Sequence, residues 1–385
     1  MARNRVIYQS EALYTSKNAA STATGDHRQL HRVQSANFNY TINRQDINQF
    51  GELARIDSVV LDPPTVSTDF SYYLTDGMNE RLLGFYVQNP STAHGDAGMG
   101  NFASGHMVGS SGKNVFIITS PEGKDINLEG FQPLQDTAIG IGNCYVSNYS
   151  VDMAVGSIPT ASVSMEGANV NSDLVTTGVP IDASNAPISG GIVDSPAVKQ
   201  SDGTSWGLQS HLPAPRTGDN NAGGDITALR PGDITLNIAE FDGQTIADIS
   251  GDGEAHVQSA SISVPLSRSP ISKLGSRFPF AREVDFPVTV SMSVSAVMNE
   301  ETAFNLVDKL VAEEKNASVI LKDKDGANAI RWDLKGAIVD TESVSSSIGS
   351  NKTVDITFSS QIGGPNDKNH GLFMSGVNSG HAFTA

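Results

Sequence analysis

The sequence predicts a mainly β protein with two tandem domains, each made of two packed antiparallel sheets. A stretch at residues 33–67 returns in altered form at residues 257–291, which indicates that one domain occurs twice. Several segments alternate apolar and polar residues with a period of two, as strands with one buried face do. The hydrophobic fraction is only 38%, and 37 glycines accompany many serines and asparagines, a composition that suits half-solvated strands joined by turns.

The repeat has two blocks with different offsets in residue number. In the first block, Arg44 and Gly51 correspond to Arg268 and Gly275. The residue numbers of each pair differ by the same amount (268 − 44), which we call the first offset. In the second block, the residue numbers of matching positions differ by a smaller constant amount (339 − 146), which we call the second offset. The matching positions are Val146 and Val339, Ser150 and Ser343, Gly156 and Gly349, and Thr160 and Thr353. The smaller offset means that the first copy carries extra residues between the blocks. We therefore divide the chain into a first domain at residues 1–168, a connector at 169–224 and a second domain at 225–385.

The first copy contains clear strand patterns and one long loop. Phe38, Tyr40 and Ile42 stand between polar residues and predict a strand with one buried face. Residues 89–112 are rich in Gly, Ser and Ala and predict a long loop. The connector is rich in Gly, Ser, Asp, Asn and Pro, which is typical of segments with little regular structure of their own.

The second copy contains the clearest strand of the chain, at residues 288–295, and the one clear helix. Asn299 is a suitable N-cap for that helix, and Glu300 and Glu301 suit its positive end. The apolar residues that follow fall on one helical face, namely Ala303, Phe304, Val307, Leu310 and Val311. The glycine-rich loop stands at the corresponding place in the first copy, so the flanking helix is clear only in the second copy.

The charge balance limits the partners. The net charge is −17, from 25 basic and 42 acidic residues. Direct nucleic-acid binding needs Lys and Arg against phosphate and is disfavoured, whereas an acidic surface keeps a polyanion from adhering. Solubility alone is the alternative explanation. Cys144 is the single cysteine and cannot form an internal disulfide, and no apolar run reaches signal or membrane-spanning length, so we expect synthesis in a cytoplasm without a membrane anchor.

No motif predicts catalysis, and we expect a protein that is not an enzyme and has no cofactor or resident metal. His27 and His31 have the spacing of a zinc-protease helix but lack the Glu after the first histidine. Residues 248–254 and 323–326 only faintly resemble calcium loops, and Asp-Gly turns explain them as well, with weak ion binding as the alternative. The chain also lacks a phosphate loop and a nucleophile elbow.

Five short segments resemble the tail tube proteins of long-tailed bacteriophages. They are RNRVIYQSEAL at 3–13, HRVQS at 31–35, NQFG at 48–51, PTVS at 64–67 and FSYYL at 70–74. The likeness covers the first copy to about residue 87 and reaches the second copy mainly through the repeat. It implies tandem tail-tube-like β-sandwich domains with a flanking helix and a long hairpin loop. Some members carry two tube domains and form trimeric rings of pseudo-sixfold symmetry, and the repeat here resembles that kind.

The resemblance implies a function and a set of partners. The function is self-assembly into stacked rings that form the virion's tail tube, a negatively charged channel through which DNA passes without binding. The partners are further copies of the chain, a tape measure inside the tube, a terminator and a tip or baseplate at its ends, and a sheath as a further candidate. The chain would be made and assembled in the host cytoplasm. Alternatives are another ring-forming virion component (a tail terminator or decoration protein), a secretion-system-like tube protein, or a carbohydrate-binding or enzymatic β protein, which the low aromatic content of 6% disfavours.

Two groups of residues are candidates for function. Arg44, Gly51, Arg268 and Gly275 occupy matching polar excursions between strands and are predicted to contact other subunits or rings. The second group alternates with apolar residues and is predicted to line the channel: Asp69, Asp152, Asp340, Asp355, Ser291 and Ser293. An ordinary solvated sheet face is the alternative for the second group, and turn geometry is the alternative for the two glycines.

Overall fold

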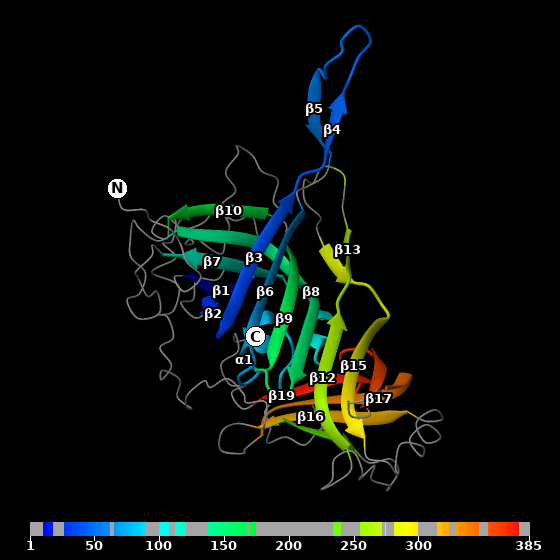
Figure 1. Cartoon of the computed structure of the whole chain (residues 1–385). Helices are drawn as coiled ribbons and strands as arrows, with labels where there is room; N and C mark the ends of the chain where they lie inside the picture. The colour runs from blue at the N-terminus through cyan, green and yellow to red at the C-terminus, as the bar shows by residue number, and fades with distance from the viewer. Residues whose placement is uncertain are drawn as a thin grey trace.

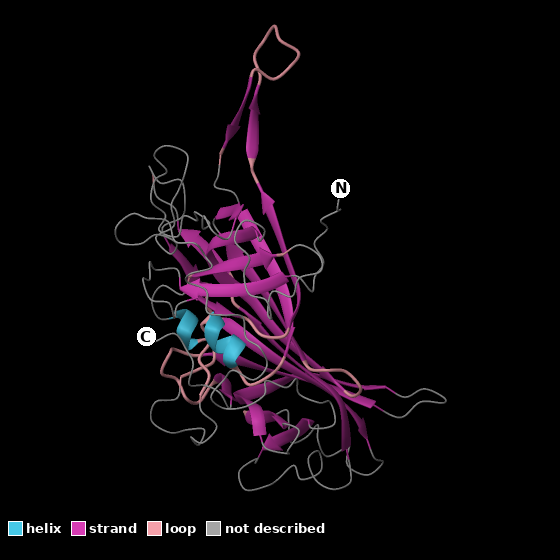
Figure 2. Cartoon of the chain, turned by 90° about the vertical axis from the view of Figure 1, so that its left-hand side faces the viewer, coloured by secondary structure: helices cyan, strands magenta, loops and turns pink. Residues whose placement is uncertain are grey.

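The computed structural model of the chain consists largely of antiparallel strands (Figure 1, Figure 2). The residues it describes are 11–17, 27–61, 65–88, 100–107, 112–120, 137–167, 169–174, 234–239, 255–271, 274, 281–298, 314–322, 328–345 and 353–376. The mainly β prediction is confirmed. The predicted helix at 299–311, Gly275 and all but the first residues of the predicted connector lie outside the described residues. No described helix is long and apolar enough to span a bilayer.

A row of antiparallel strands runs through both halves of the chain. Its order is β3-β6-β9-β8-β12-β15-β18-β17. The bounds are β3 (Val33–Thr41), β6 (Thr65–Tyr73), β9 (Thr160–Gly167) and β8 (Thr137–Ala154), then β12 (Ala255–Pro265), β15 (Val288–Met298), β18 (Thr353–Ile362) and β17 (Asn328–Ser345). We call this row the central sheet. Its first four strands come from the first half of the chain and its last four from the second.

Each half is a β-sandwich, because one long strand serves two layers. The beginning of β8 pairs with β7 (Lys113–Thr119) and β10 (Asn169–Leu174), while its end belongs to the central sheet. The beginning of β17 pairs in the same way with β16 (Lys315–Lys322) and β19 (Gly371–Gly376). The outer strands of these layers are β1 (Glu11–Lys17), β2 (His27–Gln29) and β11 (Ile234–Ala239). Figure 1 shows β7 and β10, and likewise β16 and β19, crossing the direction of the central strands.

The strand pairings of the two halves correspond at constant offsets. The β3–β6 pairing is irregular between Val33 and Ser35, and the β12–β15 pairing is irregular at the matching place, between Val257 and Ser259, one first offset later. The β8–β9 and β17–β18 pairings agree at the second offset, including the β-bulges at residues 147 and 340. These offsets are the ones found in the sequence, so the repeated residues occupy equivalent places in the two halves.

Two hairpins extend from the central sheet at equivalent positions. One is β4 (Arg44–Ile47) with β5 (Asp57–Val60), and the other is β13 (Arg268–Ile271) with β14 (Ala281–Val284). Both strands of the second hairpin follow those of the first by the first offset. Figure 1 shows the β4–β5 hairpin projecting well beyond the rest of the molecule.

Both described helices are short and belong to the first half, and the segment predicted as the clear helix of the second copy lies outside the described residues. They are α1 (Met78–Leu83) and α2 (Ser104–Met107). The six residues of α1 span less than two turns, which is too short for a helical period to appear in the sequence. In α1, Asn79 and Glu80 match the Asn299-Glu300 pair of the repeat. The short helix α2 lies within the predicted glycine-rich loop.

The two halves share one hydrophobic core. Buried residues from both halves form a single cluster, including Tyr149, Phe102, Trp332 and Phe358. Backbone bonds also join the halves, because Gln88 N–H donates to the Met374 carbonyl at 2.9 Å and Phe102 N–H donates to the Leu372 carbonyl at 2.7 Å. Strand β10 begins at residue 169, where the sequence predicts the connector, and it hydrogen-bonds to β8 of the first half.

Candidate functional site: the sheet edges and the polar face

The joint between the two halves is an ordinary antiparallel strand pair. Ile262 and Val264 of β12 stand opposite Val151 and Tyr149 of β8. All four side chains are at most 1% exposed. Burial of such side chains typically stabilises by about 1.5–3 kcal/mol each, so this joint belongs to the core.

The two ends of the central sheet carry the counterparts of the strands that form this joint. Strand β3 corresponds to β12 and ends the sheet on one side, and β17 corresponds to β8 and ends it on the other. Phe38 and Tyr40, the counterparts of Ile262 and Val264, are 37% and 55% exposed, and Val344, the counterpart of Val151, is 52% exposed. Among the described strands, nothing pairs with the outer side of β3 or with the outer side of β17 after residue 337.

These exposed side chains lie on the core side of the sheet. Phe38 stands opposite the buried Thr68, and Tyr40 stands opposite the buried Val66. Val344 stands opposite the buried Val354 in the same way. An uncovered edge strand with exposed apolar residues can pair with a strand of another chain. Natural proteins therefore cover such an edge or pair it with another strand.

The opposite side of the central sheet is polar, and we call it the polar face. It brings together most of the predicted channel residues, because Asp69, Asp152 and Asp355 are exposed on it and Ser291 and Ser293 are half-buried on it. Their cross-strand neighbours are small polar residues, namely Asn37, Ser164, Thr160, Ser261, Ser295, Ser343, Ser263, Ser359 and Thr357. Ser293 Oγ and Thr357 Oγ1 are 3.1 Å apart. Where the central strands are described and pair with one another, they contribute neither Lys nor Arg to this face.

Asp340 does not follow this pattern. It is the extra residue of the β-bulge in β17, between Val339 and Thr341, and it is exposed. The strict alternation that assigns it to the same row as the other aspartates is interrupted at a bulge, because the following residues change faces.

The two repeated arginines have different surroundings. The Arg268 guanidinium lies 5.1 Å from the centre of the Tyr145 ring, and its Nε donates to the Val146 carbonyl at 3.2 Å. Burial is the main cause that lowers the pKa of Arg268 to about 10. Arg268 therefore stabilises the joint inside the chain, a role that the sequence does not predict. Arg44 is exposed at the start of β4, and no described hydrogen bond or ion pair engages its side chain.

The hairpin tips expose apolar residues. Gly51 has a φ of +94° at the β4–β5 tip, where a Cβ would have free space but a strained backbone, so turn geometry suffices to explain this glycine. Beside it, Phe50 and Leu53 are fully exposed at 107% and 110%. Leu274, the counterpart of Phe50 in the second hairpin, is 103% exposed. Large apolar side chains at the end of a projecting arm indicate a contact surface.

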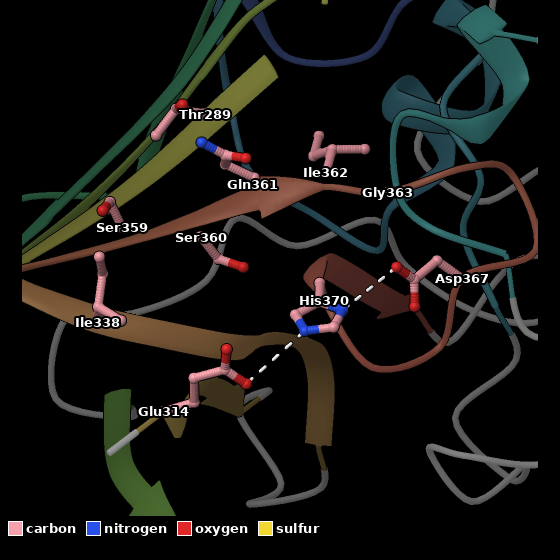
Figure 3. Close-up of a pocket in the computed structure, with 10 residues that line it drawn as sticks. All are labelled: Thr289, Glu314, Ile338, Ser359, Ser360, Gln361, Ile362, Gly363, Asp367 and His370. Carbon is pink, nitrogen blue, oxygen red and sulfur yellow. Dashed lines mark hydrogen bonds and ion pairs between the residues drawn. The ribbon is translucent and has the colours of Figure 1, made fainter. Parts of the chain in front are cut away.

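A pocket of about 480 Å³ lies beside the β17 edge (Figure 3). Its lining is Thr289, Glu314, Ile338, Ser359, Ser360, Gln361, Ile362, Gly363, Asp367 and His370. The His370 ring stands between two carboxylates, with Nε2 at 3.6 Å from Glu314 and Nδ1 at 3.2 Å from Asp367. The hydrogen bond from the Asn369 amide is the main cause that lowers the pKa of Asp367, so this carboxylate is charged at neutral pH. Sequence reasoning misses this pocket because its walls come from separate strands.

A buried polar cluster supports the first half from within. The Glu80 carboxylate accepts hydrogen bonds from Tyr72 at 2.8 Å and Tyr149 at 3.0 Å. Burial is the main cause that raises the pKa of Glu80 to about 7. Next to it, the Asn79 side chain bonds both backbone groups of His31, at 2.8 Å each. The described residues contain no group of three or more His, Cys, Asp or Glu arranged to hold a metal ion.

Comparisons with known proteins give weak structural likenesses. No family model and no curated protein matches the chain. The hybrid structure of the SPP1 tail tube is 14% identical and covers 53% of this chain and 99% of its own, with a TM-score of 0.26. The virion of a native gene transfer agent particle is 12% identical, covering 38% of this chain and 98% of its own, with a TM-score of 0.24. The anti-feeding prophage cap is 8% identical, covering 41% of this chain and 99% of its own, with a TM-score of 0.27.

Proposed function

We propose that the chain is a structural virion protein that assembles head to tail into rings, and that the stacked rings form the tube of a phage tail. The observation that carries the proposal is the pair of free edges. Strand β3 of one copy can join β17 of the next as β12 joins β8 within the chain. A contact between two different surfaces of the same chain is heterologous and closes into a ring when the rotation per copy allows it.

The internal joint gives the register of the proposed joint. Shifted by the two offsets, the pairs Ile262–Val151 and Val264–Tyr149 become Phe38–Val344 and Tyr40–Glu342. The pairing would cover Phe38, Tyr40 and Val344 and satisfy the backbone groups of both edges. It would also continue the polar face from one copy to the next without interruption.

The repeat leads us to propose that each chain supplies two equivalent tube domains, as a tandem duplication would. Three chains would then make a ring of pseudo-sixfold symmetry, the arrangement that the sequence resemblance implies. The polar face, with Asp69, Asp152 and Asp355, would line the channel and repel the phosphates of passing DNA. The projecting β4–β5 hairpin, with Phe50 and Leu53, would contact the neighbouring ring in the stack.

The remaining parts of the proposal follow from this role. The protein would act by assembly and without catalysis or a cofactor. It would be made in the host cytoplasm, reside in the virion tail, and contact a tape measure, a terminator and a tip or baseplate protein.

A disulfide cross-link tests the proposed joint. A Phe38→Cys, Val344→Cys double variant should form covalent rings of three chains under oxidising conditions, since directly opposed residues have Cβ atoms about 4.5–5.5 Å apart. The native Cys144 is buried and burial raises the pKa of its thiol to about 12, so it will not compete. The matched control is Phe38→Cys with Ser343→Cys, which places the second thiol on the opposite side of β17.

Denaturing gels and electron microscopy then decide the outcome. Covalent trimers from the first variant alone, together with stacked tubes, would support the proposal. Single rings that never stack would favour a terminator-like component. If the Phe38→Cys, Val344→Cys variant assembles as the wild type does but forms no cross-link, the proposed joint is wrong.

A further inference from the structure

The Arg268 hairpin shows how an arm is anchored beside a joint. After β12 pairs with β8, the chain enters β13, and Arg268 covers the Tyr145 ring while donating to the Val146 carbonyl. From β14, Arg282 Nη1 forms an ion pair with Glu166 at 2.9 Å. The base of the hairpin thus rests on a strip made of Tyr145, Val146 and Glu166.

The same strip in the second half has no described hairpin over it and forms part of the pocket, with Val339 half-buried and Ser359 buried. At the second offset, Tyr145, Val146 and Glu166 correspond to Ile338, Val339 and Ser359. Ile338 is 53% exposed and lines the pocket together with Ser359. Among the described residues, the place that holds a hairpin of the same chain in the first half has none in the second half.

The pocket also has an acidic wall without counterpart in the first half. Strands β9 and β10 are separated by residue 168 alone, whereas β18 and β19 are separated by residues 363–370. The longer segment carries Asp367 and His370, and Glu314 faces His370 from the other side (Figure 3). Two carboxylates line the pocket and neither Lys nor Arg does, so its charge suits a cation.

From these observations we infer that the pocket is the socket for Arg44 of the neighbouring copy. The inference rests on the proposed ring. When β3 of the neighbour pairs with β17 in the register of the internal joint, its Arg44 takes the place that Arg268 takes on the first half. The guanidinium then lies over Ile338, donates to the Val339 carbonyl, and meets Glu314 and Asp367.

The socket also differs from its internal counterpart in chemistry. In the internal joint, Arg268 Nη2 is buried without a hydrogen-bond partner. Arg44 would have carboxylates within the pocket to receive its remaining N–H groups, and Arg–carboxylate pairs are geometrically specific. The pocket thus offers Arg44 carboxylate partners of its own, whereas the ion pair beside the joint within the chain is made by Arg282 with Glu166.

Charge exchange tests this socket. Arg44→Asp and Asp367→Arg should each raise the concentration needed for half-maximal ring formation about tenfold or more, because each puts like charges together in the socket. The double variant Arg44→Asp, Asp367→Arg should restore ring formation toward that of the wild type. Arg55→Asp is the matched control, because Arg55 pairs with Asp46 within the same hairpin and should leave the ring joint intact.

Sedimentation across a concentration series gives the readout, with circular dichroism to show that each variant is folded. Recovery in the double variant supports the socket. If the single variants assemble like the wild type, or if the double variant is as defective as both singles, the socket is wrong while the ring stands. Failure of the wild-type chain to form rings would instead overturn the proposed function.

Discussion

At the scale of single residues, Glu80 is the most deeply buried carboxyl group among the described residues. It is 1% exposed and lies between two tyrosine hydroxyls beneath the central sheet. Its pKa is raised to about 7 in the folded chain, mainly by burial, from an ordinary value of 4.5. The folded state therefore binds this proton more tightly than the unfolded state, and the stability due to this group falls as pH rises from about 4.5 to about 7.

The substitution Glu80→Gln should remove this pH dependence. The amide would keep an oxygen acceptor for a tyrosine but would carry no charge at any pH. The free energy of unfolding of the variant relative to the wild type should increase by about 2 to 3 kcal/mol between pH 5 and pH 8. Urea unfolding of unassembled chains at both pH values measures this change, and an equal difference at the two pH values would refute it.

The sequence predicts single residues only where the repeat or the alternation marks them. Alternation assigns Asp69, Asp152, Asp355, Ser291 and Ser293 to one polar surface, and in the structure they do share one face. The repeat marks Glu80 through its match to Glu300, but the tyrosine partners of Glu80 and the pocket give no sequence signal, because the residues involved come from distant strands. The last part of β17 shows where prediction from alternation fails, because one inserted residue, Asp340, breaks the alternation on which the prediction depends.

At the scale of elements, the strands are predictable and the short helices are not. The alternation of Phe38 and Tyr40 predicts strand β3 correctly, but the predicted burial is wrong in the single chain, because both side chains are exposed at the sheet edge. The repeat also assigns them the same role as Ile262 and Val264, but only the structure reveals that their strand ends a sheet. The predicted contact role of Arg268 illustrates the same point, because its bonds lie within the chain while Arg44 stays exposed.

A charge on the free edge should block assembly without unfolding the chain. Phe38→Lys places an ammonium group among the core-side residues of β3, opposite Val344 in the proposed joint, and it is tolerated in the monomer because Phe38 is 37% exposed. Pairing with another strand would desolvate that charge, and edge lysines are a known device against such pairing. We expect folded monomers by sedimentation and circular dichroism.

The control for this variant is Val155→Lys, at a position 65% exposed in the turn after β8. It should form rings as the wild type does. Rings of Phe38→Lys with unchanged concentration dependence would contradict the proposed role of β3.

At the scale of the whole molecule, part of the net charge of −17 lies on the polar face of the central sheet. Three aspartates stand on a face to which the described, mutually paired parts of the central strands add no Lys or Arg. The opposite side of the same sheet is buried in a core that both halves share. The sheet therefore separates an apolar interior from an acidic surface.

Reversing the charge of the polar face should make assembled particles bind DNA. In the triple variant Asp69→Lys, Asp152→Lys, Asp355→Lys, the new ammonium groups can neutralise phosphates and release counterions. DNA binding by tubes should appear at low salt and fall steeply as salt rises, as measured by co-sedimentation. A control with Glu52, Asp57 and Glu283 changed to Lys has the same net charge on the hairpins, and equal binding by both variants would refute a channel role for the face.

The β8–β12 joint has a consequence for the concentration at which rings would assemble. It forms within one chain, so its partners meet at an effective concentration set by the linking residues and not by the amount of protein present. In a closed ring of such chains, every second joint would already exist before any two molecules met. The threshold concentration for ring formation would then depend on the β3–β17 joint alone. Changes in residues 363–370 would then raise or lower that threshold while the β8–β12 joint within the chain kept its own geometry.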